Sequence, residues 1–297
     1  MKQLLRKISR RILDRLSSEV KTQQLLLEKT SPQTKIALRS LYLNYRKSAE
    51  GGEKLPSVWD TGFRIFSQFD EDGIILFLLG AVGIGPAKFV EIGGGDGVGA
   101  SNCANLALNF GFDGLFIDGN QDLIQKGLKF YAEHPDTHFY PPRFRQALVT
   151  KKNVNKILRV AEFEGEVDLL SIDIDGNDYW IWEAIECIQP RIVVTETHVE
   201  FGQRSIVVPY KEDFAWQPGM NPYYLGASPA AMAKLADRLG YRLVGANRFG
   251  FNTFFVRKDL AANLIPEVDV ADLFRHSRNR ERMQLFETVK DFEFVSV

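Results

Sequence analysis

The chain contains little cysteine and no long hydrophobic run. Its 297 residues include only Cys103 and Cys187, too few for a disulfide framework and without a C-x-x-C zinc pair. The most apolar uncharged run, Gly73–Ala87, is rich in glycine, which favours a buried helix and turn over a membrane span. No continuous apolar stretch precedes Asp14, so we expect no secretory signal. These features predict a cytoplasmic protein in a reducing environment.

The chain also lacks an excess of one charge. Its formal net charge of −1 argues against a protein that coats nucleic acid. The charges are unevenly distributed, because residues 1–50 contain twelve Lys and Arg against four Asp and Glu. Apolar residues recur every three or four positions within 1–21, as in a basic amphipathic helix. Such a helix packs on its own domain or on a second copy of the chain, or lies at the inner face of a membrane.

A change of pattern near residue 55 divides the chain. Ser31-Pro32 predicts the start of a second helix, and residues 48–54 are typical of a linker. We therefore expect a basic helical extension over 1–55 and one large domain over 56–297. The β-rich runs of this domain are 88–92, 114–118, 144–149, 167–174 and 191–197. The helical patterns between them are 100–110, 120–133, 152–163 and 178–187.

Alternating strands and helices predict a doubly wound α/β fold. Each strand is apolar throughout, as expected for a parallel sheet that helices cover on both faces. The end of the chain departs from this alternation: a helix over 229–239 is followed by strands 241–246 and 252–257. The short connection between these strands predicts an antiparallel hairpin. We therefore expect a mostly parallel, seven-stranded, Rossmann-like sheet closed by an antiparallel hairpin.

A glycine-rich turn follows the first predicted strand. Glu91 ends the strand, and Gly93, Gly95 and Gly97 alternate in the turn before a helix expected from about Ser101. Glycine suits positions where the backbone turns sharply and a ligand approaches closely. The N-terminus of the following helix would present free N–H groups to an anionic part of that ligand. This turn predicts a nucleotide-type cofactor site.

Two cofactors fit the turn. Residues 95–100 satisfy G-x-G-x-x-A, which permits a dinucleotide such as NAD. Glu91 and Asp96, however, place negative charge beside the turn, and carboxylates repel a pyrophosphate but attract the ammonium and sulfonium of S-adenosylmethionine. Asp118, at the end of the next strand, can accept hydrogen bonds from the ribose hydroxyls of either cofactor. We favour S-adenosylmethionine and keep the dinucleotide as the alternative.

Further polar residues follow the fourth and fifth predicted strands. Asp173 and Asp175 end the fourth strand, and Glu196 and His198 end the fifth, at the edge where open α/β sheets bind ligands. We take Asp173, Asp175 and His198 as candidate catalytic residues, with Asp173 or His198 as general base. Asp173, Glu196 and His198 are candidate ligands for a divalent cation such as magnesium.

A long connection over 199–225 is rich in aromatic residues. Loops of this length are uncommon unless they are functional. The aromatic side chains suit either stacking on a ring of a ligand or packing on one another. They are Phe201, Tyr210, Phe214, Trp216, Tyr223 and Tyr224.

Between residues 60 and 258 the chain resembles the FkbM-like family of S-adenosylmethionine-dependent class I methyltransferases. The order of the matching segments makes the resemblance specific, whereas the glycine turn alone is generic to class I methyltransferases. These segments are 67–75, 89–97, 101–102, 114–120, 168–179, 226–228, 240–244 and 252–256. Metal-dependent sugar and macrolide O-methyltransferases end their fifth strand in paired acids, where this chain has Glu196 followed by Thr197-His198.

The resemblance implies a role for individual residues. Glu91, Gly93, Gly95 and Gly97 would hold the methionine part of the donor, and Asp118 its ribose. The remaining residues that the resemblance places near the donor are Gln68, Asn102, Asn120, Gln146 and Ala147.

The resemblance also implies O-methylation of a hydroxyl on a saccharide or a related polar natural product. The alternatives are an NAD(P)-dependent oxidoreductase and a non-catalytic partner of glycan-assembly machinery. We expect a small-molecule or glycan substrate and no nucleic acid. Attachment to a membrane surface or self-association would involve the basic N-terminal helix.

Overall fold

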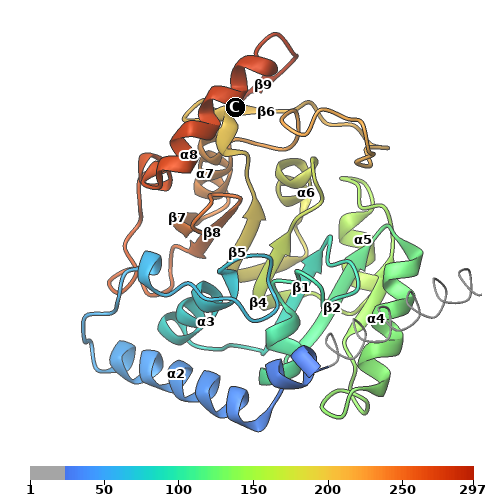
Figure 1. The fold of residues 1–297 in the computed structure, drawn as a ribbon, viewed down its shortest axis with the longest axis vertical. Helices are drawn as coiled ribbons and strands as arrows, with labels where there is room; N and C mark the ends of the chain where they lie inside the picture. Colours follow the sequence, from blue (N-terminus) through green and yellow to red (C-terminus); the bar gives the residue numbers. More distant parts are fainter. Residues whose placement is uncertain (1–23) are drawn as a thin grey trace, which may run out of the picture.

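A seven-stranded sheet forms the centre of the protein in this computed structural model, which describes residues 24–297 (Figure 1). The helix expected over 1–21 lies outside the described residues. The strands of the sheet are β1 (Lys88–Ile92), β2 (Asp113–Asp118), β3 (Arg143–Gln146), β4 (Gly165–Ile172), β5 (Ile188–Glu196), β7 (Tyr241–Ala246) and β8 (Asn252–Arg257). Two further strands, β6 (Ile206–Val207) and β9 (Val295–Ser296), form a separate antiparallel pair.

The strand order is β3-β2-β1-β4-β5-β8-β7. The first five strands are parallel, whereas β8 runs antiparallel to both β5 and β7. The expected doubly wound sheet with an antiparallel C-terminal hairpin is therefore confirmed. An antiparallel strand inserted at this edge distinguishes the class I methyltransferase fold from the all-parallel sheet of dinucleotide dehydrogenases. The chain has the former fold.

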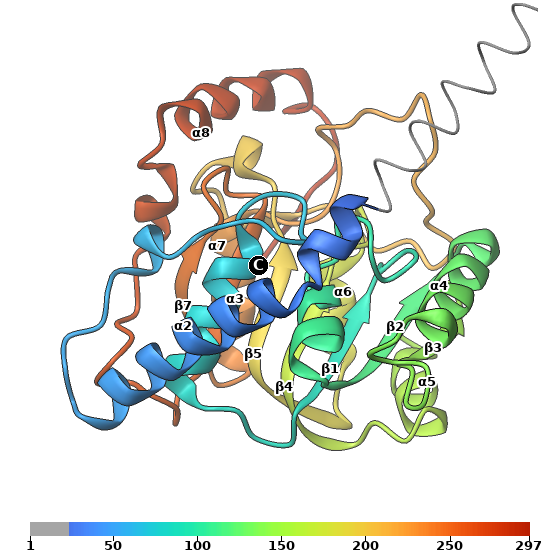
Figure 2. The same ribbon diagram turned by 60° about the horizontal axis from the view of Figure 1, so that its bottom comes forward.

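Helices cover both faces of the sheet (Figure 2). Successive side chains of a strand point to opposite faces, so Val90 packs on one side of β1 and Phe89 on the other. The Val90 face is covered by α5 (Val154–Val160), α6 (Asp178–Ala184) and α7 (Pro229–Arg238). The Phe89 face is covered by α3 (Glu71–Val82) and α4 (Gln121–Glu133). The apolar core thus consists of two layers, one on each side of the sheet.

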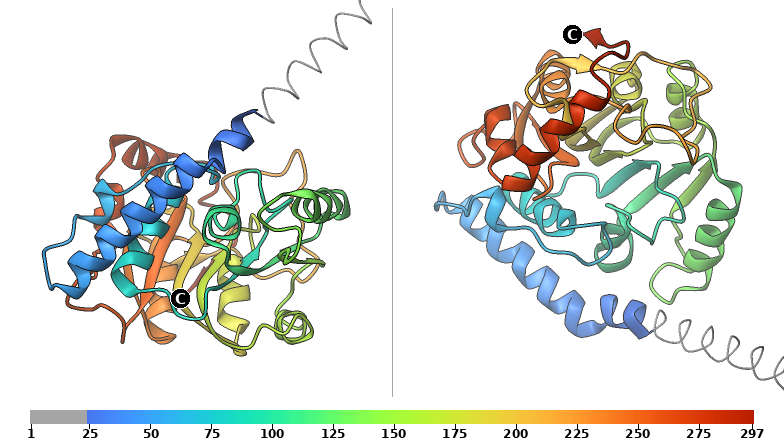
Figure 3. Two further views of the ribbon diagram at one scale, coloured as in Figure 1. Left: turned by 90° about the horizontal axis from the view of Figure 1, so that it is seen from below. Right: turned by 45° about the horizontal axis from the view of Figure 1, so that its top comes forward.

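Helix α2 (Pro32–Glu50) lies along the outside of α3 (Figure 3). The Ser31 hydroxyl caps its first turn by accepting from the backbone N–H of Thr34 at 3.2 Å, and Pro32 follows directly, as the sequence predicts. Leu38 and Ala49 are buried. The helix continues through the first residues of the expected linker, and the division of the chain near residue 55 stays a prediction. None of the helices between residues 24 and 297 is long and apolar enough to cross a membrane.

The helix expected over 100–110 is shorter than predicted. Residues 100–103 are not helical, Ala100 has a φ of +58°, and the helical segment ends in a π-helical turn over Leu106–Phe110. The side chain of Glu91 causes this difference, because it binds the residues that would form the first turn. Strands β3 and β4 also end before the predicted positions 149 and 174. Asp173 consequently lies just beyond its strand rather than within it.

The C-terminal segment returns to the carboxyl ends of the parallel strands. It contains α8 (Ser277–Arg282), and its last strand, β9, pairs with β6 from the connection after β5 (Figure 1). A third, smaller apolar cluster joins the two segments: Phe201, Val208, Phe286 and Val289. The sequence pattern alone did not reveal that the chain end lies beside the strand ends.

Candidate functional site

A cavity of about 770 Å³ lies at the carboxyl ends of β1, β2 and β4. Among residues 24–297, three carboxylates line it, those of Asp118, Asp173 and Asp175, and no Lys, Arg or His does. The other lining residues are Ile92, Gly93, Ile117, Gly119, Asn120, Leu123, Ala147, Leu148, Val149, Ile174, Asn177, Phe214, Ala215 and Trp216. The cavity therefore combines apolar walls with negative charge, at the edge where parallel α/β sheets bind ligands.

The glycine turn contributes Gly93 to the lining of this cavity, at a position that excludes a side chain. Gly93 has a φ of +86°, and a Cβ there would lie 1.6 Å from the carbonyl oxygen of Asp173. The backbone N–H of Gly93 donates to the carbonyl of Ile117 at 2.8 Å, so the turn joins three neighbouring strands. Gly95 has a φ of +56° and faces more open space.

Two acids of the turn region, Glu91 and Asp96, accept hydrogen bonds from backbone N–H groups. Glu91, 4% exposed, accepts from Asn102 at 2.8 Å and Cys103 at 3.2 Å and from the Ser101 hydroxyl at 2.6 Å. Burial raises the pKa of Glu91. Asp96 accepts from Val98 and Gly99 at 3.0 and 2.8 Å.

The prediction of a helix N-terminus with free N–H groups after the turn is therefore wrong. Glu91 already binds the N–H groups that were predicted to face an anionic part of the ligand. Glu91 thus binds the backbone that follows the turn and is not among the residues that line the cavity. The acidic side chains that line the cavity are instead those of Asp118, Asp173 and Asp175.

Asp118 holds both the turn and the next helix in place. Its Oδ2 atom accepts from the N–H of Gly95 at 2.9 Å, and its Oδ1 atom accepts from the N–H of Asn120 at 2.7 Å. Asn120 caps α4 through its own side chain. Each carboxylate oxygen can accept more than one hydrogen bond, so Asp118 keeps acceptor capacity toward the cavity.

The other predicted donor residues divide between the cavity and its surroundings. Ala147 lines the cavity, whereas Gln146 is exposed and donates to the Gly119 carbonyl at 3.4 Å. Asn102 is buried and donates to the Ser171 hydroxyl at 3.0 Å. Gln68 is exposed beside the turn, because its neighbour Ser67 pairs with Ala100.

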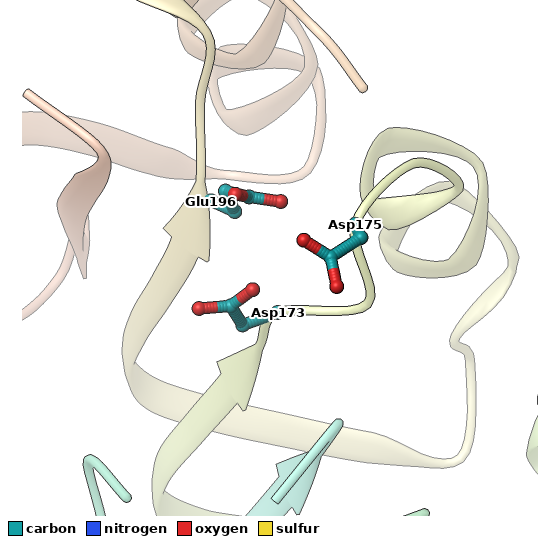
Figure 4. A group of neighbouring side chains, drawn as sticks. All are labelled: Asp173, Asp175 and Glu196. Atoms are coloured by element: carbon teal, nitrogen blue, oxygen red, sulfur yellow. The ribbon is translucent and has the colours of Figure 1, made fainter. Parts of the chain in front are cut away.

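Asp173, Asp175 and Glu196 point toward one another (Figure 4). One carboxylate oxygen of each lies within 4.8 Å of those of the other two. Asp173 and Glu196 were predicted as metal ligands, whereas Asp175 was predicted as a catalytic residue. His198, the third predicted metal ligand, does not belong to this group of three carboxylates. The residues come from two different strand ends, β4 and β5, which the parallel sheet places side by side.

Mutual repulsion and burial change the protonation of this cluster. Burial, followed by the charges of Asp178 and Asp175, raises the pKa of Asp173 well above its ordinary value. Burial and the charge of Asp173 do the same for Glu196. The pKa of Asp178 rises to about 6, mainly through burial, although its oxygens accept from the N–H groups of Ile174 and Gly176. The cluster thus retains protons or binds a cation near neutral pH.

His198 lies between two glutamates. Its Nε2 atom is 3.9 Å from Glu196 and its Nδ1 atom 3.9 Å from Glu200, and Glu200 forms an ion pair with Arg282 of α8. Within the described part of the chain, His198 Nε2, Glu196 Oε2 and Glu200 Oε2 have no hydrogen-bond partner. Burial lowers the pKa of His198, so its neutral form is favoured. These unpaired buried atoms indicate a site that a ligand completes.

The aromatic residues of the 199–225 connection divide into those that pack on one another and those that face a possible ligand site. Most of its aromatic rings pack on other aromatic residues, whereas Phe214 and Trp216 line the cavity. The packed rings are those of Phe201, Tyr210, Tyr223 and Tyr224.

Sequence reasoning missed most of the apolar cavity lining. Leu123, Leu148, Val149 and Ile174 follow strand ends, but apolar residues at such positions do not differ from core residues in a sequence. Asn177 was also missed. Only the aromatic richness of the 199–225 connection signalled in advance the contribution of Phe214 and Trp216.

Comparisons with known proteins yield distant structural similarities. No family model matches the chain, and no curated protein matches it. An O-methyltransferase from Bacillus cereus in complex with SAH is 12% identical, with a TM-score of 0.41, over 73% of this chain and 89% of that one.

Two further solved structures are similar to the same degree. Magnesium protoporphyrin IX methyltransferase from Synechocystis PCC 6803, with bound SAM, is 14% identical, with a TM-score of 0.39, over 63% of this chain and 77% of that one. The CcbJ methyltransferase from Streptomyces caelestis is 12% identical, with a TM-score of 0.39, over 63% of this chain and 94% of that one. The fold assignment rests on the strand order and register described above.

Proposed function

We propose that this chain is an S-adenosylmethionine-dependent methyltransferase of the FkbM-like family. We further propose that it methylates a hydroxyl oxygen of a saccharide or a related polar natural product. One observation carries the choice of cofactor: in the part of the chain that the structure describes, three carboxylates and no cationic side chain line the cavity at the strand ends. A sulfonium and an ammonium group are attracted there, whereas a pyrophosphate is repelled.

The residues of the cavity fit the parts of such a donor. Asp118 faces the cavity with acceptor capacity suited to ribose hydroxyls, and the turn around Gly93 admits a ligand close to the backbone. Ala147, Val149 and Ile174 offer apolar walls for a purine ring. A donor bound there supplies an activated methyl group for transfer to a nucleophile.

The acceptor hydroxyl is assigned to the cluster of Asp173, Asp175, Glu196 and His198. Several carboxylates at one edge suit a hydroxyl-rich acceptor, because each can accept hydrogen bonds from a polyol. The raised pKa makes Asp173 a stronger base than an ordinary aspartate, and the lowered pKa of His198 favours the neutral imidazole, which can accept a proton. Alignment of the acceptor oxygen is the second requirement, and the pairing of β4 with β5 brings the ends of the two strands that carry these residues side by side.

A divalent cation such as Mg²⁺ fits the same cluster. Three carboxylate oxygens within 4.8 Å of one another form the hard oxygen environment that Mg²⁺ prefers. The unpaired Oε2 atom of Glu196 and the unpaired Nε2 atom of the buried His198 are independent signs of a missing ligand. Asp173, Asp175 and Glu196 would hold the ion, which would lower the pKa of an acceptor hydroxyl.

Calorimetry with S-adenosylhomocysteine and with NAD tests the choice of cofactor. We expect the full chain to bind S-adenosylhomocysteine and to show no heat of binding with NAD. A thermal shift gives the same comparison independently, because a ligand stabilises only the fold that binds it. Tight binding of NAD without binding of S-adenosylhomocysteine would assign the chain to the oxidoreductases. Donor binding without methyl transfer to any member of a glycan panel would favour the non-catalytic role.

A further inference from the structure

Residues 208–216 form a segment whose last three residues line the cavity, and we refer to it as the cover segment. On one side, the Asn177 side chain donates to the Lys211 carbonyl at 2.8 Å, next to the start of α6. On the other side, Lys152 forms an ion pair with Glu212 at 2.7 Å, next to the start of α5. Phe214, Ala215 and Trp216 lie beyond these anchors and line the cavity.

The ring of Phe214 packs directly against Gly176. A Cβ on Gly176 would lie 2.4 Å from the Cε1 atom of the Phe214 ring, so only glycine leaves room for the ring there. The ring lines the main cavity and also a smaller one of about 170 Å³, so it forms part of the wall between them. Gly176 lies between Asp175 and Asn177, at the turn that ends β4. The ring is thus fixed beside the carboxylate cluster.

Trp216 has a different environment. Its side chain is 44% exposed although the residue lines the cavity. Within residues 24–297, neither Trp216 nor Phe214 packs against another aromatic ring or a cationic side chain, in contrast to Phe201, Tyr210 and Tyr224 of the same connection. Two aromatic faces therefore remain available at the cavity, beside its aliphatic, acidic and amide side chains.

We propose that Phe214 and Trp216 bind the purine ring of the methyl donor, which makes the cover segment part of the donor site. The inference rests on the proposed function, since it assumes an adenine-containing donor. Flat aromatic side chains favour a flat heteroaromatic ligand through stacking. The apolar side chains of Val149 and Ile174 suit the same ring and are contributed by the sheet. The donor would then be held between the sheet edge and the cover segment.

Adenosine separates this contact from the rest of the donor site. Adenosine contains the purine and the ribose but lacks the amino acid part of S-adenosylhomocysteine. Loss of a stacking residue should therefore weaken the binding of both ligands by a similar factor. We expect Trp216→Ala and Phe214→Ala each to raise the dissociation constant of both ligands about tenfold, as measured by calorimetry. Trp216→Phe should restore most of the affinity, because it keeps an aromatic face.

Two controls accompany these variants. Trp59→Phe changes a tryptophan that lies against Arg275, away from the cavity, and should bind both ligands as the unchanged protein does. Quenching of tryptophan fluorescence by S-adenosylhomocysteine gives a second readout. We expect the quenching to be lost in Trp216→Phe and retained in Trp59→Phe.

The outcomes distinguish this inference from the proposed function. Unchanged affinity for both ligands in Trp216→Ala and Phe214→Ala, with normal binding by the unchanged protein, would overturn the stacking role alone. Failure of the unchanged protein to bind S-adenosylhomocysteine would overturn the donor assignment and the inference with it. Weakened binding of S-adenosylhomocysteine but not of adenosine would also refute the stacking role, because the lost contact would then lie at the amino acid part.

Discussion

The carboxylate of Asp118 accepts a hydrogen bond from the backbone N–H of Gly95 at 2.9 Å and lines the cavity at the strand ends at the same time. One side chain thus links the conformation of the glycine turn to the site where ribose is proposed to bind. Asp96, in the same turn, also accepts backbone N–H groups but does not line the cavity. Substitution of Asp96 therefore affects only the turn, whereas substitution of Asp118 affects both the turn and the cavity lining.

Asp118→Ala should weaken the binding of S-adenosylhomocysteine. The variant loses the acceptor for ribose and the hydrogen bond to Gly95, so we expect a dissociation constant raised about thirtyfold. Asp96→Asn removes the same charge from the turn without altering the cavity lining, and its dissociation constant should change less than about threefold. Calorimetry measures both. Equal losses in the two variants would show that Asp118 acts only through the turn.

Asp173→Asn should lower turnover but raise stability at alkaline pH. The folded-state pKa of Asp173 is raised, mainly by burial, so the folded protein binds more protons than the unfolded chain. Stability from this group is present at low pH and is lost as the pH rises through the folded-state pKa. An asparagine carries no charge and avoids that loss. Thermal unfolding should therefore show a higher Tm for the variant at mildly alkaline pH, with the difference shrinking in acid.

The measurement also tests the cause of the pKa shift. If the carboxylate of Asp173 were instead stabilised by its surroundings, the variant would lose stability most strongly at alkaline pH. Binding of S-adenosylhomocysteine should change less than turnover, because the acceptor, not the donor, is assigned to this cluster.

Addition of Mg²⁺ should raise the Tm of the unchanged protein. The ion would relieve the repulsion among Asp173, Asp175 and Glu196, and a ligand that binds only the folded state stabilises it. Glu196→Gln should abolish the Mg²⁺-dependent shift, whereas Glu267→Gln, at an exposed carboxylate elsewhere, should retain it. A shift of equal size in both variants would place the ion outside the cluster.

Arg282→Met should destabilise the fold through Glu200. Glu200 is 1% exposed and is paired with Arg282, so removal of the guanidinium leaves a buried carboxylate without its partner. Because the Arg282 side chain is partly exposed, we expect a loss of about 2 kcal/mol, below the range for fully buried pairs. Combination with Glu200→Gln should recover part of that loss in urea unfolding. Additive losses in the double variant would contradict the pairing.

Gly93→Ala should prevent the turn from forming. The new Cβ would lie 1.6 Å from the Asp173 carbonyl oxygen, and the residue would keep a positive φ. We expect a loss of about 4 kcal/mol or more, or no folded protein. Gly52→Ala is the matched control, since Gly52 has a φ of +67° with no atom within 4 Å of the new Cβ, and should cost only about 1 kcal/mol. Urea unfolding compares the two.

The sequence by itself determined the fold and the position of the site. Strand β1 and the hairpin strands β7 and β8 have the predicted bounds, because apolar runs between glycine-rich turns leave few other conformations. Asp118 and Asp173 were identifiable because the carboxyl ends of parallel strands meet at one edge.

Only the tertiary structure decided how the acidic residues are used. Glu91 and Asp96 bind backbone N–H groups within the turn, and the charge facing a ligand comes from other strand ends. Trp216 and Arg282 reach the site from segments remote in sequence. Periodicity reports which face of an element is buried, but not which distant segment covers it. These contacts depend on how loops fold back over the sheet, and no local pattern encodes that path.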